Sequence, residues 1–336
     1  MNADDNVVTN SEIVAKPLVS VLVPSYNHEK YVIECLESIK NLCYPRLELI
    51  LSDDKSSDTT YDLAGQWIKQ NDSRFERAIA IRQPKNLGIV QNLQYLFDGA
   101  RGEYLAYIAS DDEFLPSSME DRIATLQANQ DIDAVFGNAQ LISSSGTVLR
   151  ERFIPRRIAR ELRFRSLLIK SLLVNWQVPG PVMMLRRKAV SAGGSIGTLP
   201  LDLKGEDKYI YIRLASLCKL MFVDAIVAKY RMVENSASRA HALRRTVAYY
   251  NIQSDTKNKH LLGGVNRCII DLTIAAFDLE LNKGQKPFYI LKKILFRCAS
   301  IGLKVMLFVA ALVYRAMDLR YRARLSRKGA PPLAGA

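Results

Sequence analysis

Residues 18–27 read LVSVLVPSYN, an apolar run that is rich in valine and stops at a proline. A short, continuous apolar run of this kind is typical of a parallel strand that is buried on both faces of a sheet. Pro24 and Asn27 interrupt the run, and apolar residues then recur at helical spacing over residues 29–40. A buried strand that leads directly into a helix is the first half of a βαβ unit, so this stretch predicts an α/β fold.

The alternation of strand and helix continues well beyond this first unit. Further strands are expected over residues 47–51, 78–82, 104–109 and 134–138, with helices between them over residues 57–68, 90–99 and 117–129. This order implies a Rossmann-like, mostly parallel sheet flanked by helices. Polar residues gather where the strands end, which is where such sheets bind ligands. No GxGxxG follows the first strand and no GxxxxGK[ST] is present, which disfavours a dinucleotide-binding domain and an NTPase phosphate loop.

After residue 146 the pattern changes. Residues 150–165 hold seven arginines, residues 182–185 and 220–230 are expected to form strands, and residues 206–217 a helix. From residue 240 onward the sequence has helical character.

Composition excludes several classes of protein. Of the 336 residues, 49% are hydrophobic and 24% charged, which is an ordinary globular balance and excludes a disordered chain or a collagen-like fibre. The five cysteines form no CxxC pair, so a structural zinc site is not expected and a reducing compartment is favoured. Residues 1–16 are polar and acidic, without the features of a signal peptide, and are expected to be a disordered lead-in to a cytoplasmic protein.

The net charge of +13 is concentrated near the C-terminus. Residues 283–328 contain twelve Lys or Arg residues and one acid, and an apolar run over residues 305–314 lies among them. Ten residues are too few for a helix to span the roughly 30 Å of a bilayer core. The pattern predicts an interfacial helix held at an anionic membrane surface. A core helix with a solvated basic end and a short transmembrane helix are the alternatives. No nucleic-acid-binding signature is present, so nucleic acid is not expected as a partner.

Six motifs occur in one order along the chain. They are VSVLVPSYN at 19–27, DDKSSD at 53–58, NLG at 86–88, SDD at 110–112, ED at 206–207 and YR at 230–231. Together they resemble the inverting glycosyltransferases of family 2, which have a GT-A fold, and in particular those of bacterial surface-polysaccharide synthesis. The resemblance covers roughly residues 17–236. It leaves a helical, basic, membrane-associated region over 237–328 and a flexible tail over 329–336.

The resemblance implies the activity of a hexosyltransferase. One sugar would move from a nucleotide-sugar, most readily a UDP-sugar, to a hydroxyl of a glycan or lipid-linked saccharide. A basic tail would hold the enzyme peripherally on the inner face of the plasma membrane, where the lipid-linked acceptor lies.

A divalent cation is expected next to the donor diphosphate. Carboxylates that converge at a strand end can hold Mg²⁺ or Mn²⁺, hard cations that prefer oxygen ligands and offset the charge of the leaving group. Asp111 and Asp112 follow an expected buried strand and suit this task. The family's motif is Asp-x-Asp, and here its first position is Ala109. The resemblance implies that Asp111 binds both metal and nucleotide-sugar, and that Asp112 is the second metal ligand. The alternative is that Asp112 and Glu113 cap the following helix.

The resemblance also implies which residues border the nucleotide. They are Pro24, Tyr26, Asn27, Asp53, Asn86 and Gly88. We expect Tyr26 to stack on the base and Asp53 to accept a hydrogen bond from the base or ribose. Asp58 is more typical of helix-cap chemistry.

Inversion requires one general base that takes the proton of the acceptor hydroxyl. The resemblance implies that Asp207 is this base and that Glu206 orients the base or the acceptor. Two acids at a helix N-terminus, favourable to the helix dipole, are the alternative. Arg231 is expected to neutralise phosphate, but Val233 stands where the family often has a histidine.

The histidines are not expected to act in catalysis. His28 follows the turn after the first strand and is expected to be a loop residue, and His241 and His260 to be structural. The departures at residues 109 and 233 leave two other functions open, a nucleotide-sugar binding module without transfer activity and a membrane scaffold of a polysaccharide assembly complex.

Overall fold

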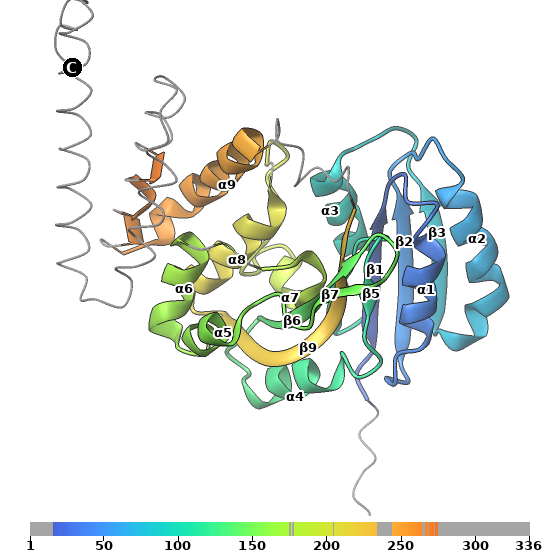
Figure 1. Ribbon diagram of the computed structural model, residues 1–336, viewed down its shortest axis with the longest axis horizontal. Helices are drawn as coiled ribbons and strands as arrows, with labels where there is room; N and C mark the ends of the chain where they lie inside the picture. The colour runs from blue at the N-terminus through green and yellow to red at the C-terminus, as the bar shows by residue number, and fades with distance from the viewer. Residues whose placement is uncertain are drawn as a thin grey trace, which may run out of the picture.

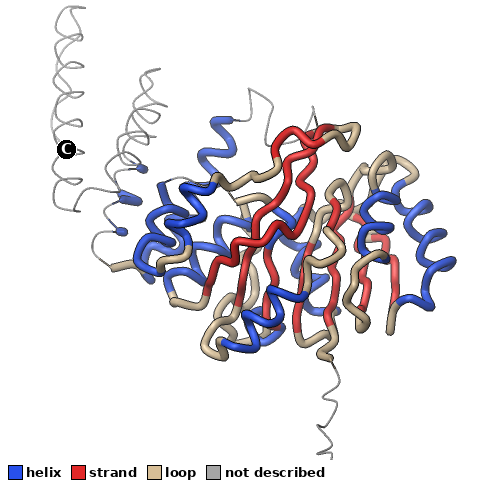
Figure 2. The backbone as a smooth tube through the Cα atoms, turned by 60° about the horizontal axis from the view of Figure 1, so that its bottom comes forward, coloured by secondary structure: helices blue, strands red, loops and turns tan. Residues whose placement is uncertain are grey.

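The computed structural model describes most of the chain. Described are residues 16–174, 176, 178–203, 205–233, 244–263, 266–267, 269–271 and 273–274. The strands run side by side through the middle of this part of the molecule, with helices on either side of them (Figure 2). Residues 1–15, which are expected to be disordered, lie outside the described residues. So does the basic segment 283–328, which is expected to contain a helix at the membrane surface. In the part that is described, no helix has the length and apolar character needed to cross a bilayer.

The first half of the chain forms the parallel sheet that its sequence predicts. Its strands are β1 (Val19–Ser25), β2 (Leu47–Asp53), β3 (Arg77–Arg82) and β4 (Tyr104–Tyr107). They lie in the order β3-β2-β1-β4, and each pair of neighbours is parallel. All seven residues of β1 and of β2 are buried, as the apolar runs indicate.

Three helices connect these strands, and a fourth, α4, follows β4. They are α1 (Val32–Lys40), α2 (Thr60–Asn71), α3 (Ile89–Gly99) and α4 (Glu120–Ala128), with a 3₁₀ turn over Asp72–Arg74. In α1 the buried residues Val32, Cys35, Leu36 and Ile39 recur at helical spacing and form the face that packs on the core. α1 packs against α2, and α3 packs against β1 and β2 (Figure 1).

The second half of the sheet is mixed. It consists of β5 (Glu113–Phe114), β6 (Ala134–Ser143), β7 (Val148–Arg150), β8 (Met183–Arg186) and β9 (Leu220–Met232). β8 lies between β4 and β6 and is antiparallel to both. β6 is parallel to β9, whose far end pairs with β5. Figure 1 shows β9 as a long, curved strand, and its thirteen residues carry the chain from β6 to the carboxyl end of β4.

The remaining helices cover this half of the sheet. They are α5 (Arg156–Leu162), α6 (Arg165–Val174), α7 (Arg187–Val190), α8 (Glu206–Ser216) and α9 (Arg244–Asn258), with 3₁₀ turns over Gly180–Val182 and Lys259–Leu261. Buried polar contacts join α9 to α8. Lys208 Nζ lies 2.6 Å from Asp255 Oδ2, and Asn258 Nδ2 donates to the Tyr209 carbonyl at 2.9 Å. The helix that begins with Glu206 is therefore supported from outside the segment over which the resemblance extends.

Candidate active site

The order of the strands places a switch point between β1 and β4. β2 and β3 are added on one side of β1, whereas β4 lies on the other side. Open α/β sheets bind ligands outside the carboxyl ends of the strands at such a point. The ladder between β1 and β4 ends where Ile108 N donates to the Leu22 carbonyl at 3.0 Å. The next bond would need the N–H that Pro24 lacks, so β1 and β4 are no longer paired from here on.

The polar turns after these strands are linked to one another. Ser110 Oγ, after β4, donates to Ser25 Oγ at the end of β1 at 2.9 Å, and both side chains are buried. Asn27 has a positive φ of 54°, which asparagine tolerates better than most residues. Its Oδ1 accepts a hydrogen bond from Ser57 N at 2.9 Å, and its N donates to Ser56 Oγ at 2.9 Å. Asn27 thus fastens the turn after β1 to the turn after β2.

The residues expected at the nucleotide differ in how accessible they are. Tyr26 is 45% exposed, so its ring face is available for stacking. Asp53 is fully buried, and its carboxylate accepts hydrogen bonds from the backbone N (2.9 Å) and the hydroxyl of Ser56. The structure therefore gives Asp53 a role in forming the turn, and its contact with a nucleotide stays a prediction.

A carboxylate that the sequence analysis did not single out holds the loop before α3. Asp54 is buried and accepts hydrogen bonds from Leu87 N at 2.6 Å and Gly88 N at 2.8 Å. Gly88 has a φ of 78°, which glycine adopts without strain. Asn86 is exposed, and its Oδ1 also accepts from Gly88 N, at 3.1 Å. The loop that is expected to shape the nucleotide pocket is thus fixed to the end of β2.

Asp58 supports the start of α2, although Thr59 and not Asp58 is the N-cap residue. Its Oδ1 accepts a hydrogen bond from Thr60 N at 3.0 Å, at the start of α2. Its Oδ2 accepts from Glu29 N at 3.2 Å, which adds another link between the first two turns.

The expected metal ligands lie directly after β4. Asp112 is 2% exposed, and its Oδ1 accepts a hydrogen bond from Arg231 N at 2.7 Å. Burial, and next the negative charge of Asp111, raise the pKa of Asp112 well above its ordinary value. The alternative of helix capping is wrong, because β5 (Glu113–Phe114) and a turn separate these acids from α4.

His28 lies beside the first of these carboxylates. Its Nε2 is 3.8 Å from Asp111 Oδ2, and its Nδ1 is 2.8 Å from Ser110 Oγ. The expectation that His28 is only a loop residue missed this placement. The sequence carried no signal for it, because about 80 residues separate the histidine from its neighbours.

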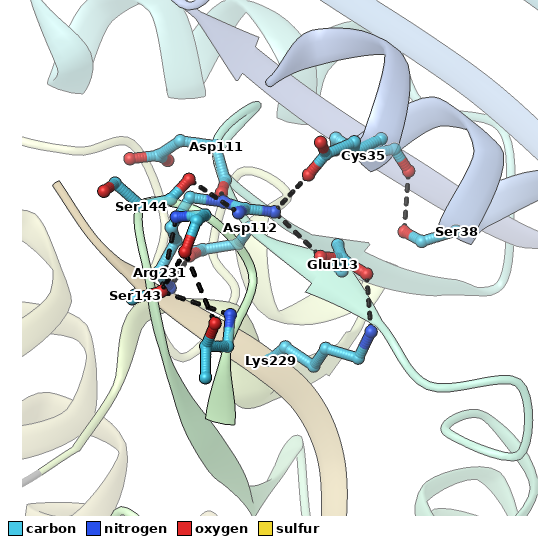
Figure 3. A network of polar contacts seen from close by, with 12 residues as sticks. Cys35, Ser38, Asp111, Asp112, Glu113, Ser143, Ser144, Lys229 and Arg231 are labelled. Atoms are coloured by element: carbon cyan, nitrogen blue, oxygen red, sulfur yellow. Dashed lines mark hydrogen bonds and ion pairs between the residues drawn. The ribbon is translucent and has the colours of Figure 1, made fainter. Parts of the chain in front are cut away.

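Arg231 ties the acidic segment to the rest of the molecule (Figure 3). Its guanidinium donates to Glu34 Oε2 at 2.5 Å, to Glu113 Oε1 at 2.8 Å and to the Asp111 carbonyl at 2.8 Å. It also lies 5.0 Å from the centre of the Tyr31 ring, and its side chain is only 1% exposed. Arg231 is thus an anchor for the turn that carries the expected metal ligands. Contact between Arg231 and phosphate stays a prediction. It would require Arg231 to replace some of these hydrogen bonds with bonds to the phosphate.

The expected base begins α8. Gly205 precedes it with a φ of 97°, and Glu206 and Asp207 form the first helical turn. Tyr107 OH, at the end of β4, donates to Asp207 Oδ1 at 2.8 Å. Burial raises the pKa of Asp207, and the bond from Tyr107 opposes that rise. Burial and then the charge of Asp207 raise the pKa of Glu206 to about 7.

Asp207 and the expected metal ligands belong to one electrostatic site. The charge of Asp207 also contributes to the raised pKa of Asp112, although burial and Asp111 contribute more. A favourable interaction with the helix dipole therefore does not account for the two acids of α8 by itself. Tyr107 was missed as a site residue because, in sequence, it belongs to a buried strand. Its hydroxyl was the available signal, since a buried tyrosine needs a hydrogen-bond partner.

The donor set fits a divalent cation that is shared with a ligand. No group of three or more His, Cys, Asp or Glu residues that could hold a metal occurs among the described residues. Mg²⁺ at phosphate sites is bound by one or two carboxylates together with the phosphates of the substrate. Asp111 and Asp112 supply two carboxylates, and the cation would offset the repulsion that raises the pKa of Asp112.

Solved structures share the fold. The Staphylococcus aureus protein TarS, residues 1–349 in complex with UDP-GlcNAc, aligns with a TM-score of 0.59 at 17% identity, covering 93% of this chain and 92% of that one. The mannosyltransferase PcManGT of Pyrobaculum calidifontis, in complex with GDP-Man and Mn²⁺, aligns with a TM-score of 0.58 at 17% identity, covering 91% and 87%. The expected GT-A fold is confirmed.

Several sequence relatives are named as glycosyltransferases. An uncharacterized glycosyltransferase of Methanocaldococcus jannaschii is 29% identical over 251 residues, which cover 73% of this chain and 81% of the relative. The GalNAc(5)-diNAcBac-PP-undecaprenol beta-1,3-glucosyltransferase of Campylobacter jejuni is 32% identical over 135 residues. That match covers 40% of this chain and 42% of the relative, less than half of either.

The family model described as glycosyl transferase family 2 matches residues 20–193. This range holds β1 to β8, both metal-ligand candidates and every residue expected at the nucleotide except Arg231. The match covers more than half of the chain, so the chain belongs to glycosyl transferase family 2.

Proposed function

We propose that this glycosyltransferase moves one sugar, with inversion at the anomeric carbon, from a nucleotide-sugar to a hydroxyl of its acceptor. The observation that carries the proposal is the pair of Tyr107 and Asp207. In this pair a carboxylate of raised pKa accepts a hydrogen bond from a residue at the end of β4, and its charge acts on Asp112. A base with a pKa nearer to neutral is better matched to proton transfer than an ordinary carboxylate.

The proposed reaction is a single displacement. The acceptor oxygen forms a bond to the anomeric carbon as Asp207 takes its proton, and the bond from that carbon to the diphosphate oxygen breaks on the opposite face. The diphosphate leaves with its bonding electrons, and one inversion results. Held by Asp111 and Asp112, a divalent cation would offset the charge that develops on the leaving group. Glu206, whose pKa of about 7 leaves it partly protonated at neutral pH, would in its protonated form donate a hydrogen bond to the acceptor or the base.

A UDP-sugar is the proposed donor. The TarS structure, which shares the fold, was solved with UDP-GlcNAc, whereas the Pyrobaculum enzyme was solved with GDP-Man. The exposed ring of Tyr26 offers a stacking surface. The loop at Asn86 and Gly88 is fixed to the end of β2, the strand that pairs with β1.

The proposed acceptor is a glycan or a lipid-linked saccharide of bacterial surface-polysaccharide synthesis. The Campylobacter relative is named for an undecaprenol-linked acceptor. In this chain, α5 buries Ile158, Ala159 and Leu162 and exposes three arginines, Arg156, Arg157 and Arg160. A cationic helix face of this kind attracts anionic lipid or phosphate groups. We therefore propose that the enzyme works peripherally on the inner face of the plasma membrane.

The test is donor turnover on purified protein. UDP-, GDP- and dTDP-sugars are offered with and without Mn²⁺, to wild type and to Asp207→Asn, which keeps an acceptor for the Tyr107 hydroxyl. We expect one nucleotide class to bind in both proteins and turnover only in wild type. The anomeric coupling constant of the product, measured by proton NMR, is expected to show inversion. Equal turnover by Asp207→Asn, or a product of retained configuration, would contradict the proposal. Binding without turnover in wild type would favour a non-catalytic binding module.

A further inference from the structure

The helix that carries the proposed base begins at a glycine. Gly205 is the N-cap residue of α8, and with a φ of 97° and a ψ of 58° it lies in the left-handed region. It has no side chain that could cap the helix, and glycine is the residue whose backbone is least restrained. Asp207 follows two residues later, so the orientation of the Gly205 peptide affects where its carboxylate lies. The first turn of α8 therefore depends on support from elsewhere in the chain.

α9 supplies this support through Ser254. The hydroxyl of Ser254, which is fully buried, donates a hydrogen bond to the Gly205 carbonyl at 2.8 Å. The same hydroxyl lies 3.1 Å from the Tyr250 carbonyl, within its own helix. A Cβ at Gly205 would be 3.5 Å from Ser254 Oγ and 3.5 Å from Tyr250 Cβ. α9 is thus packed directly on the backbone of this glycine.

Two further contacts join the same helices just after the base. Lys208 Nζ lies 2.6 Å from Asp255 Oδ2, and both side chains are buried. Asn258 Nδ2 donates to the Tyr209 carbonyl at 2.9 Å. Asn258 lies four residues after Ser254, so both point from the same face of α9. α9 therefore holds the backbone of α8 both before and after the base.

The carboxylate of the base is held by a different element. Tyr107 OH, at the end of β4, donates to Asp207 Oδ1 at 2.8 Å, and among the described residues this carboxylate accepts no other hydrogen bond. A single bond of this kind orients the carboxylate but does not fix the backbone from which it projects. The position of the base consequently depends on two supports, the sheet through Tyr107 and α9 through Ser254.

We propose that Ser254 is a positioning residue of the proposed base. By fixing the Gly205 carbonyl, it holds the first turn of α8 so that the Asp207 carboxylate meets the proton of the acceptor hydroxyl. The inference rests on the proposed function, because Asp207 is the base only if that function holds. It extends the working site beyond residues 20–193, which the family model matches, to a helix near the C-terminal end of the described chain.

The experiment compares the turnover rate with nucleotide affinity in the full chain. The rate is that of UDP release from the UDP-sugar that wild type turns over, with Mn²⁺ present and water as the acceptor. Calorimetry gives the affinity for UDP and the number of UDP sites per chain, and thermal melts show that each protein is folded.

The test variant is Ser254→Ala, which removes only the hydroxyl. The matched control is Thr256→Ala, because the Thr256 hydroxyl donates at 2.8 Å to the Ile252 carbonyl within α9. Asp207→Asn is measured beside them, so that a failure of the proposed function can be told from a failure of the inference.

We expect kcat to fall by about tenfold or more in Ser254→Ala, because a displacement of about 1 Å can cost about 100-fold in rate. The affinity for UDP and the number of sites should equal those of wild type, since Ser254 supports the base and not the nucleotide. An unchanged number of sites would also show that the lower rate does not come from an unfolded fraction. Thr256→Ala should keep the kcat of wild type.

Three results would overturn the inference. With Asp207→Asn inactive, a wild-type kcat in Ser254→Ala, or an equal fall in Thr256→Ala, would remove the role of Ser254 and leave the proposed function standing. A loss of UDP sites that accounts for the lower rate of Ser254→Ala would mean that the hydroxyl supports the fold as a whole and not the base. Turnover by Asp207→Asn at the rate of wild type would remove the proposed function together with the inference.

Discussion

The hydroxyl of Tyr107 tunes and orients the proposed base, and Tyr107→Phe isolates this effect. The substitution removes the 2.8 Å hydrogen bond to Asp207 Oδ1 and little else, because the ring stays in the core of the sheet. Hydrogen bonds to charged groups are worth about 1.5–3 kcal/mol. The loss of a bond of this strength should raise the pKa of Asp207 further, because that bond is what opposes the effect of burial. A water molecule that replaces the hydroxyl would make the rise smaller.

The sign of the kinetic effect follows from the role of the base. Asp207 must be ionised to take a proton, so a higher pKa moves the acid limb of the kcat/KM profile to higher pH. Activity in Tyr107→Phe should therefore be depressed most strongly at low pH, by about tenfold for each pH unit that the limb moves, and should approach wild type as the pH rises. Donor affinity should change little, since Tyr107 holds the base and not the nucleotide.

The assay is the pH dependence of kcat/KM between pH 5 and 9 for wild type, Tyr107→Phe and Tyr44→Phe. Tyr44 is a suitable control, because its side chain is also buried and its hydroxyl donates to a backbone carbonyl, that of Pro17, at 2.6 Å. Its removal should lower stability without moving the profile. An acid limb that stays in place in a folded Tyr107→Phe, or that moves equally in Tyr44→Phe, would refute the reasoning.

Three further variants test the charges of the site and its support. Burial raises the pKa of Glu206 from an ordinary 4.5 to about 7, so wild type loses stability as the pH rises between these values. In urea denaturation, Glu206→Gln should therefore be more stable than wild type by up to about 3 kcal/mol at pH 8. At pH 4 the two proteins should be equally stable. Asp112→Asn keeps an acceptor for the Arg231 N–H but lacks a charge, so calorimetry should show Mn²⁺-dependent UDP binding weakened about tenfold or more, with little change in melting temperature. Lys208→Met should cost about 3–5 kcal/mol by removing the cation of a buried ion pair with Asp255, and the double variant with Asp255→Leu should recover part of it.

The local elements of the first half could be predicted because their signals are local. β1 and β2 are buried on both faces, so each is a continuous apolar run, and the face that α1 buries recurs at helical spacing. The short spacing of these elements leaves parallel pairing with helical crossovers as the natural arrangement. The site position followed from the same pattern, because parallel strands end at one edge.

The second half could not be predicted in the same way because its pairings are long-range. β8 enters the sheet between β4 and β6 and is antiparallel to both. More than seventy residues of chain separate it from β4. Nothing in the sequence of β8 specifies its partners, since it consists of three apolar residues and one arginine. The placement of Arg231 also depends on long-range pairing. β9 pairs along β6, and its length and curvature bring Arg231 to Asp112.

Arg231 and the carboxylates of the site show how the fold separates structural charge from functional charge. The cation of Arg231 is held by Glu34 and Glu113, so it is satisfied before any ligand arrives. Asp112 accepts a hydrogen bond from the backbone N–H of Arg231. Its pKa is nevertheless raised, because burial and next the charge of Asp111 outweigh that bond and the charge of the guanidinium. If the guanidinium neutralised these acids directly, the repulsion that makes them receptive to a divalent cation would be lost. The arrangement therefore uses one arginine to hold the turn in place, and in the proposed function the negative charge of the carboxylates would be offset by a divalent cation.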